Sequence, residues 1–145
     1  MSVLDEIGRI VAAGGPDVLR TVVKTLHDHC EHYSWIGIYL VDRDELLLGP
    51  WEGPQATEHV RIPVGQGICG AAAASGRTEV VDDVNADPRY LACFPSTRSE
   101  IVVPISHHGR VVGEIDIDSD RPAAFGADDR AQLERVARLI APFCH

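Results

Sequence analysis

The chain has 145 residues, the size of one domain, which is enough to bury a core without disulfide or metal staples. It carries 13 basic and 22 acidic residues, and its net charge of -9 argues against nucleic-acid and anionic membrane partners. Its apolar stretches have only the length of strands, and the N-terminal segment lacks a signal-peptide pattern. We therefore predict a single domain over residues 1–145, located in the reducing cytoplasm.

Hydrophobic periodicity predicts helix over the first 32 or so residues, with a break at a Gly-Gly-Pro sequence over 14–16. The period then changes to that of strands. We expect a hairpin from 35–41 and 46–51, a short strand over 59–64, and a short helix over 70–75. A strand over 78–82, a long loop over 85–97, a second hairpin from 101–105 and 111–117, and a helix over 128–143 follow. Hairpins with helices at both chain ends indicate an α+β fold with a central antiparallel sheet.

Residues 65–70 match the Gly-x-Gly-x-x-Gly pattern of dinucleotide-binding loops, but their context is wrong for that function. The following helix ends by Gly76, which is too short for a βαβ crossover. The acids after the next strand also come too early, and the rest of the chain consists of hairpins. We interpret the glycines as positions where the backbone passes close to another part of the chain.

Two of the four cysteines are candidates for redox chemistry. Cys69 lies between glycines just before the predicted short helix, and a helix N-terminus would lower the pKa of its thiol. Cys93 lies in the long loop, where a substrate can reach it. Cys30 instead fits a helical core stripe, and Cys144 is next to the C-terminus. The alternative is that Cys69 and Cys93 are two small apolar residues.

Three acids form a second candidate cluster. Asp116 and Asp118 are two apart on a predicted strand and therefore share a face, and Glu100 opens the partner strand. Carboxylates on one face repel each other, so one pKa should rise unless a cation sits among them, either a substrate ammonium or a metal ion. A solvated outer face is the alternative.

Two aromatic residues of the first hairpin are also candidates. Trp35 and Tyr39 have the even spacing that places both on one face of a strand. They could line a pocket for a small apolar group, and core packing explains each of them equally well.

Several segments of the chain resemble the free methionine-(R)-sulfoxide reductases, which are single GAF domains. The resemblance runs from about Ser34 to the last helix, and the order and spacing of its cysteines and acids are specific. The segments that carry it are Trp-Ile-Gly-Ile-Tyr (35–39), Leu-Gly-Pro-Trp (48–51), Arg-Ile-Pro-Val-Gly-Gln-Gly-Ile-Cys-Gly (61–70), Leu-Ala-Cys (91–93), Ser-Glu-Ile-Val-Val-Pro-Ile (99–105) and Asp-Ile-Asp-Ser (116–119). It implies a GAF-like fold with about six antiparallel strands and the N- and C-terminal helices packed on one face.

The resemblance also implies a reaction. Cys93 matches the attacking cysteine, which becomes a sulfenic acid as methionine departs, and Cys69 matches a resolving cysteine that would form a disulfide with Cys93. An external dithiol such as thioredoxin would reduce this disulfide, with no bound cofactor. The substrate-binding acids of the family match Glu100, Asp116 and Asp118, and its pocket tryptophan matches Trp35. A homodimer is also implied.

Two positions depart from the family pattern. His59 stands where many members carry a third cysteine, and we interpret it as a replacement rather than as a group that keeps a cysteine ionised. Phe94 follows the attacking cysteine where Asp is frequent. The competing hypothesis is a non-catalytic GAF domain that senses a small ligand, and a third is cation binding by the acids.

Overall fold

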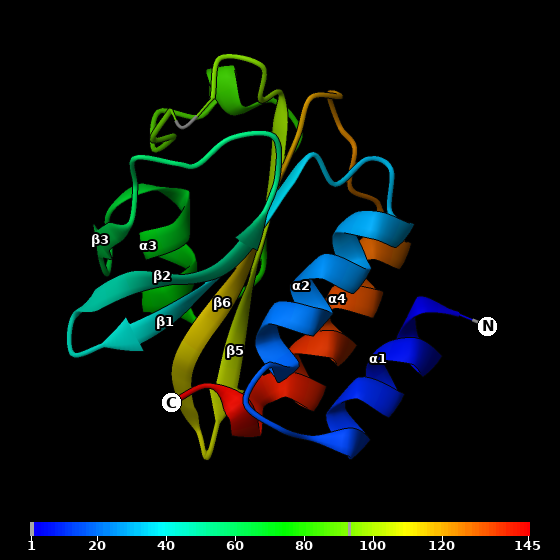
Figure 1. The fold of residues 1–145 in the computed structure, drawn as a ribbon. Coiled ribbons are helices and arrows are strands. Elements are labelled where there is room, and N and C mark those ends of the chain that lie inside the picture. Colours follow the sequence, from blue (N-terminus) through cyan, green and yellow to red (C-terminus); the bar gives the residue numbers. More distant parts are fainter. Residues whose placement is uncertain (1, 93) are drawn as a thin grey trace.

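The computed structural model describes residues 2–92 and 94–145, so the predicted nucleophile Cys93 lies outside the described residues. Figure 1 shows a sheet with helices on both of its faces. The helices are α1 (Val3–Ala13), α2 (Val18–His29), α3 (Gly67–Ser75) and α4 (Ala127–Ile140), with short 3-10 helices η1 (Val84–Ala86) and η2 (Ala141–Phe143). The strands are β1 (Trp35–Asp42), β2 (Glu45–Glu52), β3 (Arg61–Pro63), β4 (Glu79–Val81), β5 (Ser99–His107) and β6 (Arg110–Ser119).

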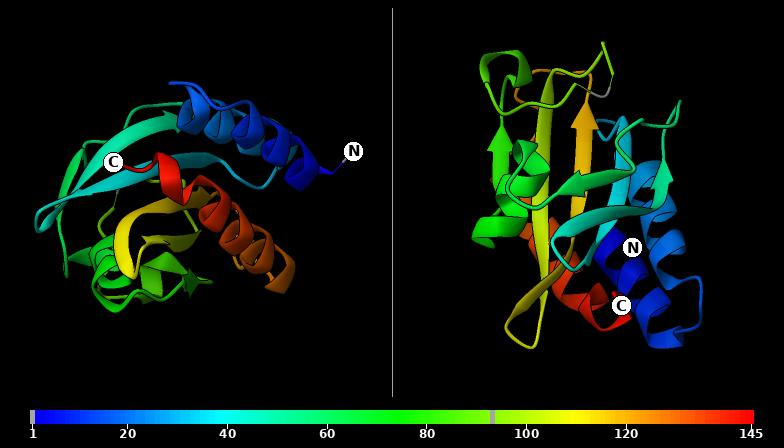
Figure 2. Two further views of the ribbon diagram at one scale, coloured as in Figure 1. Left: turned by 90° about the horizontal axis from the view of Figure 1, so that it is seen from below. Right: turned by 90° about the vertical axis from the view of Figure 1, so that its left-hand side faces the viewer.

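All six strands belong to one antiparallel sheet, in the order β3-β2-β1-β6-β5-β4. The hairpins β1–β2 and β5–β6 meet in the middle, where β1 pairs with β6. The sheet is strongly curved, as the two views of Figure 2 show. The predicted α+β fold with six antiparallel strands is therefore confirmed.

Helices α1, α2 and α4 cover one face of the sheet, and α3 lies on the opposite face (Figures 1 and 2). The first face contains the larger apolar core, to which Ile115 and Ile117 of β6 contribute. A second, smaller core lies under α3 and includes Trp35, Tyr39 and Cys69. Both faces of the central strands are thus buried. Side chains near the middle of β6 are therefore removed from water whichever face they point to, and polar side chains among them need partners inside the protein.

The helix α3 begins at Gly67, three residues earlier than its periodicity predicts, and Cys69 therefore lies in its first turn. The first turn of this helix requires glycine. A Cβ on Gly70 would lie 2.8 Å from the Pro63 carbonyl oxygen, and a Cβ on Gly67 would lie 2.7 Å from Cδ1 of Leu91. The glycines allow close backbone approach, as their spacing indicates.

Two further features concern the C-terminus and the helices. Cys144, which is next to the C-terminus, is buried and packs in the larger core. Within the described residues, none of the helices combines the length and apolar character needed to cross a bilayer.

Candidate functional site

A row of acids lies on the face of the sheet beneath α3. Glu114, Asp116 and Asp118 alternate along β6 with isoleucines that face the larger core, and Glu100 of β5 pairs directly with Asp118. All four side chains are buried, with exposed fractions of 5% or less. The alternative of a solvated outer face is therefore wrong, because α3 and the neighbouring loops cover this face.

Burial dominates the electrostatics of this row. It raises the pKa of Glu100, Glu114 and Asp118 well above the ordinary values, and the charge of Asp116 raises each of them further. Burial also raises the pKa of Asp116, although hydrogen bonding to Glu100 and the nearby charge of His59 oppose the shift. The sequence predicted that repulsion between carboxylates on one face would raise a carboxyl pKa. The direction of the shift is as predicted, but burial is a larger cause than repulsion.

Cys69 faces these acids from the first turn of α3. Its Sγ lies 4.0 Å from Oε2 of Glu100, and the side chain is only 7% exposed. Burial raises the pKa of its thiol well above the ordinary value, and the charges of Asp116, Glu114 and Glu100 raise it further. The prediction that the helix N-terminus lowers this pKa is wrong, because desolvation and the acids outweigh the helix dipole.

A small cavity of about 20 Å³ joins several of the predicted site residues. It has room for little more than a water molecule or an ion. Eight residues line it: Tyr39, His59, Ile62, Ile68, Cys69, Leu91, Glu100 and Asp116. The structure thus brings together four of the predicted site residues, namely Cys69, Glu100, Asp116 and Tyr39.

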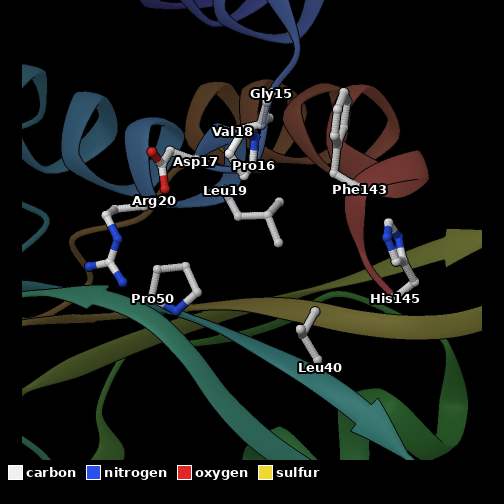
Figure 3. A pocket seen from close by; sticks show the side chains of 10 residues that line it. All are labelled: Gly15, Pro16, Asp17, Val18, Leu19, Arg20, Leu40, Pro50, Phe143 and His145. Carbon is white, nitrogen blue, oxygen red and sulfur yellow. The ribbon is translucent and has the colours of Figure 1, made fainter.

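A wider hollow of 370 Å³ lies elsewhere, between the start of α2, strands β1 and β2, and the C-terminal end of the chain (Figure 3). Among its lining residues Asp17 alone has an acidic side chain and none is a cysteine. Although this hollow is larger, it contains no thiol. The small cavity is the better candidate for the functional site because a cysteine and two buried acids line it.

Trp35 and Asp118 lie beside the cavity, next to the residues that line it. They pair with each other across β1 and β6, and Gly37 pairs with Asp116 two residues further along β1. The indole of Trp35 lies over Gly37, where a Cβ would be 2.5 Å from Cη2 of the ring. Trp35 also packs against Phe94, with ring centroids 5.9 Å apart, so an aromatic group continues the site towards the loop.

His59 connects the cavity to the segment that precedes Cys93. Its Nε2–H donates a hydrogen bond of 3.1 Å to the carbonyl oxygen of Ala92, and the hydroxyl of Tyr39 donates one of 2.8 Å to the His59 carbonyl oxygen. His59 therefore belongs to the site. The sequence indicated only that a histidine stands where many family members have a cysteine.

The same segment is held at a second point. Arg89 donates hydrogen bonds to both carboxylate oxygens of Asp87 and to Glu79 of the edge strand β4, at distances of 2.8 to 3.0 Å. The side chain of Leu91 packs over Gly67 at the start of α3. These contacts fix the course of the chain immediately before residue 93.

Glu114 is the site residue that sequence reasoning missed. It is fully buried, and neither of its carboxylate oxygens has a hydrogen-bond partner among the described residues. Its signal was present in the sequence, because it continues the two-residue spacing of Asp116 and Asp118 along one face of the strand.

Comparisons with known proteins place the chain in a family. The model of the GAF domain matches residues 16–142. The free methionine-R-sulfoxide reductase of Escherichia coli is 37% identical over 134 residues, which cover 86% of this chain and 80% of the relative.

Solved structures agree with this relationship. The free methionine-R-sulfoxide reductase from Neisseria meningitidis, determined in complex with its substrate, is 40% identical with a TM-score of 0.89, covering 97% of this chain and 84% of the other. A protein from Burkholderia vietnamiensis that is named as a GAF sensor is 32% identical with a TM-score of 0.89, covering 96% and 89%. The chain belongs to the GAF domain family and, within it, to the family of the free methionine-R-sulfoxide reductases.

Proposed function

We propose that this protein reduces the (R)-sulfoxide of free methionine to methionine. The observation that carries the proposal is the buried cavity in which the Cys69 thiol and the carboxyl groups of Glu100 and Asp116 meet. A thiol supplies the reducing electrons, and buried carboxyl groups suit the recognition of an amino acid's ammonium. The relatives named as reductases of this compound support the same assignment.

The acids have two tasks in this proposal. Burial raises the pKa of Glu100 and Asp118, which favours their protonated forms. An arriving ammonium stabilises the ionised form, so substrate binding releases protons from the cluster. A carboxyl group that remains protonated can donate its proton to the sulfoxide oxygen.

The reaction then proceeds through two thiols. The Cys93 thiolate attacks the sulfoxide sulfur and forms a sulfur–sulfur bond to it, while a proton joins the oxygen. The resulting hydroxyl group then moves to the Cys93 sulfur, the bonds from the methionine sulfur to oxygen and to Cys93 break, and methionine leaves while Cys93 becomes a sulfenic acid. The thiolate of Cys69 attacks the Cys93 sulfur, the S–O bond breaks, and the oxygen leaves as water while a Cys69–Cys93 disulfide forms. A thioredoxin-type dithiol reduces this disulfide by exchange and restores both thiols.

Deprotonation of Cys69 is the demanding part of the second step, because its environment raises the pKa of the thiol. Asp116 is the acid whose charge acts on it most strongly. We assign it the role of accepting the Cys69 proton. Trp35 and Tyr39 are assigned to the methyl end of the substrate, and the cavity must widen around Leu91 and His59 to admit it.

A thioredoxin-coupled assay on the separated epimers of free methionine sulfoxide tests the proposal. We expect turnover of the R epimer, no turnover in Cys93→Ser, and one methionine released per enzyme molecule in Cys69→Ser. Cys30→Ser is the matched control and should keep full activity, because Cys30 packs against the opposite face of the sheet. Full activity in Cys93→Ser would refute the mechanism.

A non-catalytic sensor of a small ligand is the second candidate, and the Burkholderia vietnamiensis relative named as a sensor favours it. Mass spectrometry after peroxide treatment separates the two. A specific Cys69–Cys93 disulfide supports the reductase, whereas oxidation spread over all four cysteines supports the sensor. A homodimer and a cytoplasmic location stay predictions.

A further inference from the structure

Three side chains from separate elements converge on the small cavity with one potential ligand atom each. Sγ of Cys69 on α3 and one carboxylate oxygen each of Glu100 on β5 and Asp116 on β6 all lie within 4.8 Å of one another. All three residues are buried. The spacing is set by the pairing of β5 with β6 and by the packing of α3 across both strands.

Two oxygens at this site have no partner within the described part of the chain. They are Oδ1 of Asp116, which lines the cavity, and Oδ1 of Asp118 beside it. Buried polar atoms normally have a hydrogen-bond partner or a bound ion. An ammonium group could satisfy these oxygens by hydrogen bonding, whereas a thiophilic metal ion would also form a coordinate bond to the sulfur that shares the cavity with them.

We propose that Cys69, Glu100 and Asp116 form a binding site for a thiophilic divalent cation such as Zn²⁺. Zinc binds thiolate and carboxylate ligands in a tetrahedron, with bonds of about 2.3 Å to sulfur and about 2.0 Å to oxygen. Such bonds place sulfur and oxygen roughly 3.5 Å apart, so the 4.0 Å between Cys69 Sγ and Glu100 Oε2 shortens only slightly. Water completes the coordination, and the cavity volume of about 20 Å³ suits an ion.

The donor set selects among metals. Calcium and magnesium prefer oxygen ligands alone, whereas a thiolate favours zinc and similar metals. Binding forms a metal–sulfur bond and releases the proton of Cys69 together with any protons on the two acids, so affinity rises with pH.

The site has a regulatory consequence that rests on the proposed reductase function. The bound metal occupies Cys69, which the second thiol step needs, and the acids that receive the substrate ammonium. It therefore stops turnover reversibly and competes with methionine sulfoxide.

Cobalt(II) is the probe for the experiment, because thiolate ligation to Co²⁺ produces a charge-transfer absorption band in the near ultraviolet. The measurement uses Cys93→Ser, which removes the other candidate thiol, in a buffer without chelators or added thiols. We expect the band in this variant, its loss on addition of Zn²⁺, and its loss in Cys93→Ser/Cys69→Ser. Cys93→Ser/Cys144→Ser is the control and should retain the band, because Cys144 belongs to the core on the other face of the sheet.

Ligand variants and a chemical readout complete the test. Asp116→Asn in the Cys93→Ser background should weaken Co²⁺ binding roughly tenfold or more. Zn²⁺ should also protect Cys69 from iodoacetamide without protecting Cys30, as read by mass spectrometry, provided that circular dichroism shows the variants folded. A missing band, or a band that persists without Cys69, would overturn the proposal. Neither readout depends on turnover, so failure of the reductase function would be recognised separately.

Discussion

Glu114 offers a direct measurement of what burial does to the acidic row. Its side chain is fully buried, and its carboxylate oxygens have no hydrogen-bond partner among the described residues. Burial raises the pKa of this group well above the ordinary value of 4.5, the charge of Asp116 raises it further, and the Cys69 thiol opposes the shift. The change Glu114→Gln keeps the shape of the side chain and removes its titration.

The sign of the effect follows from proton binding. Between the ordinary pKa of 4.5 and the raised folded value, the folded protein holds a proton on Glu114 that the unfolded chain has lost. The free energy of unfolding therefore falls as pH rises, by about 1.4 kcal/mol per pH unit from this one group. The stability of Glu114→Gln relative to the unsubstituted protein should thus increase steadily with pH above the ordinary pKa of 4.5, for as long as pH stays below the raised folded value.

Urea unfolding followed by far-ultraviolet circular dichroism over this pH range measures the difference. Glu58→Gln is the matched control, because it makes the same chemical change at an exposed position outside the acidic row. The two proteins should be almost equally stable at the acidic end and diverge steadily above it. A difference between Glu114→Gln and the unsubstituted protein that stays constant over the range would refute the assignment of a buried, protonated Glu114.

Three further predictions concern the segment before residue 93. Gly67→Ala places a Cβ 2.7 Å from Leu91 at a φ of +71°, so we expect destabilisation of about 1 kcal/mol or more in thermal unfolding and a loss of reductase activity. His59→Ala removes the hydrogen bond to the Ala92 carbonyl; KM should rise by a factor corresponding to about 0.5–1.5 kcal/mol, and His59→Gln should recover part of it. Arg89→Ala should change the free energy of unfolding by less than about 1 kcal/mol, because its ion pairs are partly exposed, yet it should increase hydrogen exchange across this segment. Unchanged exchange would contradict a restraining role.

Local sequence patterns were sufficient for the outline of the fold. The pattern over residues 101–105 and 111–117 predicted the second hairpin. The observed strands β5 and β6 are longer than predicted at both ends. The start of α3 at Gly67 was missed because glycine has a poor intrinsic helix propensity. Gly67 has a φ of +71°, and its conformation is set by the close approach of Leu91.

The candidate site shows the same division. The two-residue spacing of Asp116 and Asp118 determined that they share a face, because side chains of a strand alternate. Whether that face meets water depended on α3, which comes from another part of the chain and covers it. The wrong prediction for the pKa of Cys69 has this cause: the helix dipole is a local property, whereas the acids around the thiol come from β5 and β6.

The sequence by itself thus determined the periodic elements, the pairing of neighbouring strands, and which residues lie on the same side of each strand. These properties depend on contacts between residues close in the chain. Only the tertiary structure decided that Cys69, Glu100 and Asp116 meet in one cavity, that His59 borders it, and that Glu114 is fully buried. Burial and the distance between groups on different elements depend on the register of β1, β5 and β6 and on the position of α3, and no local pattern encodes them.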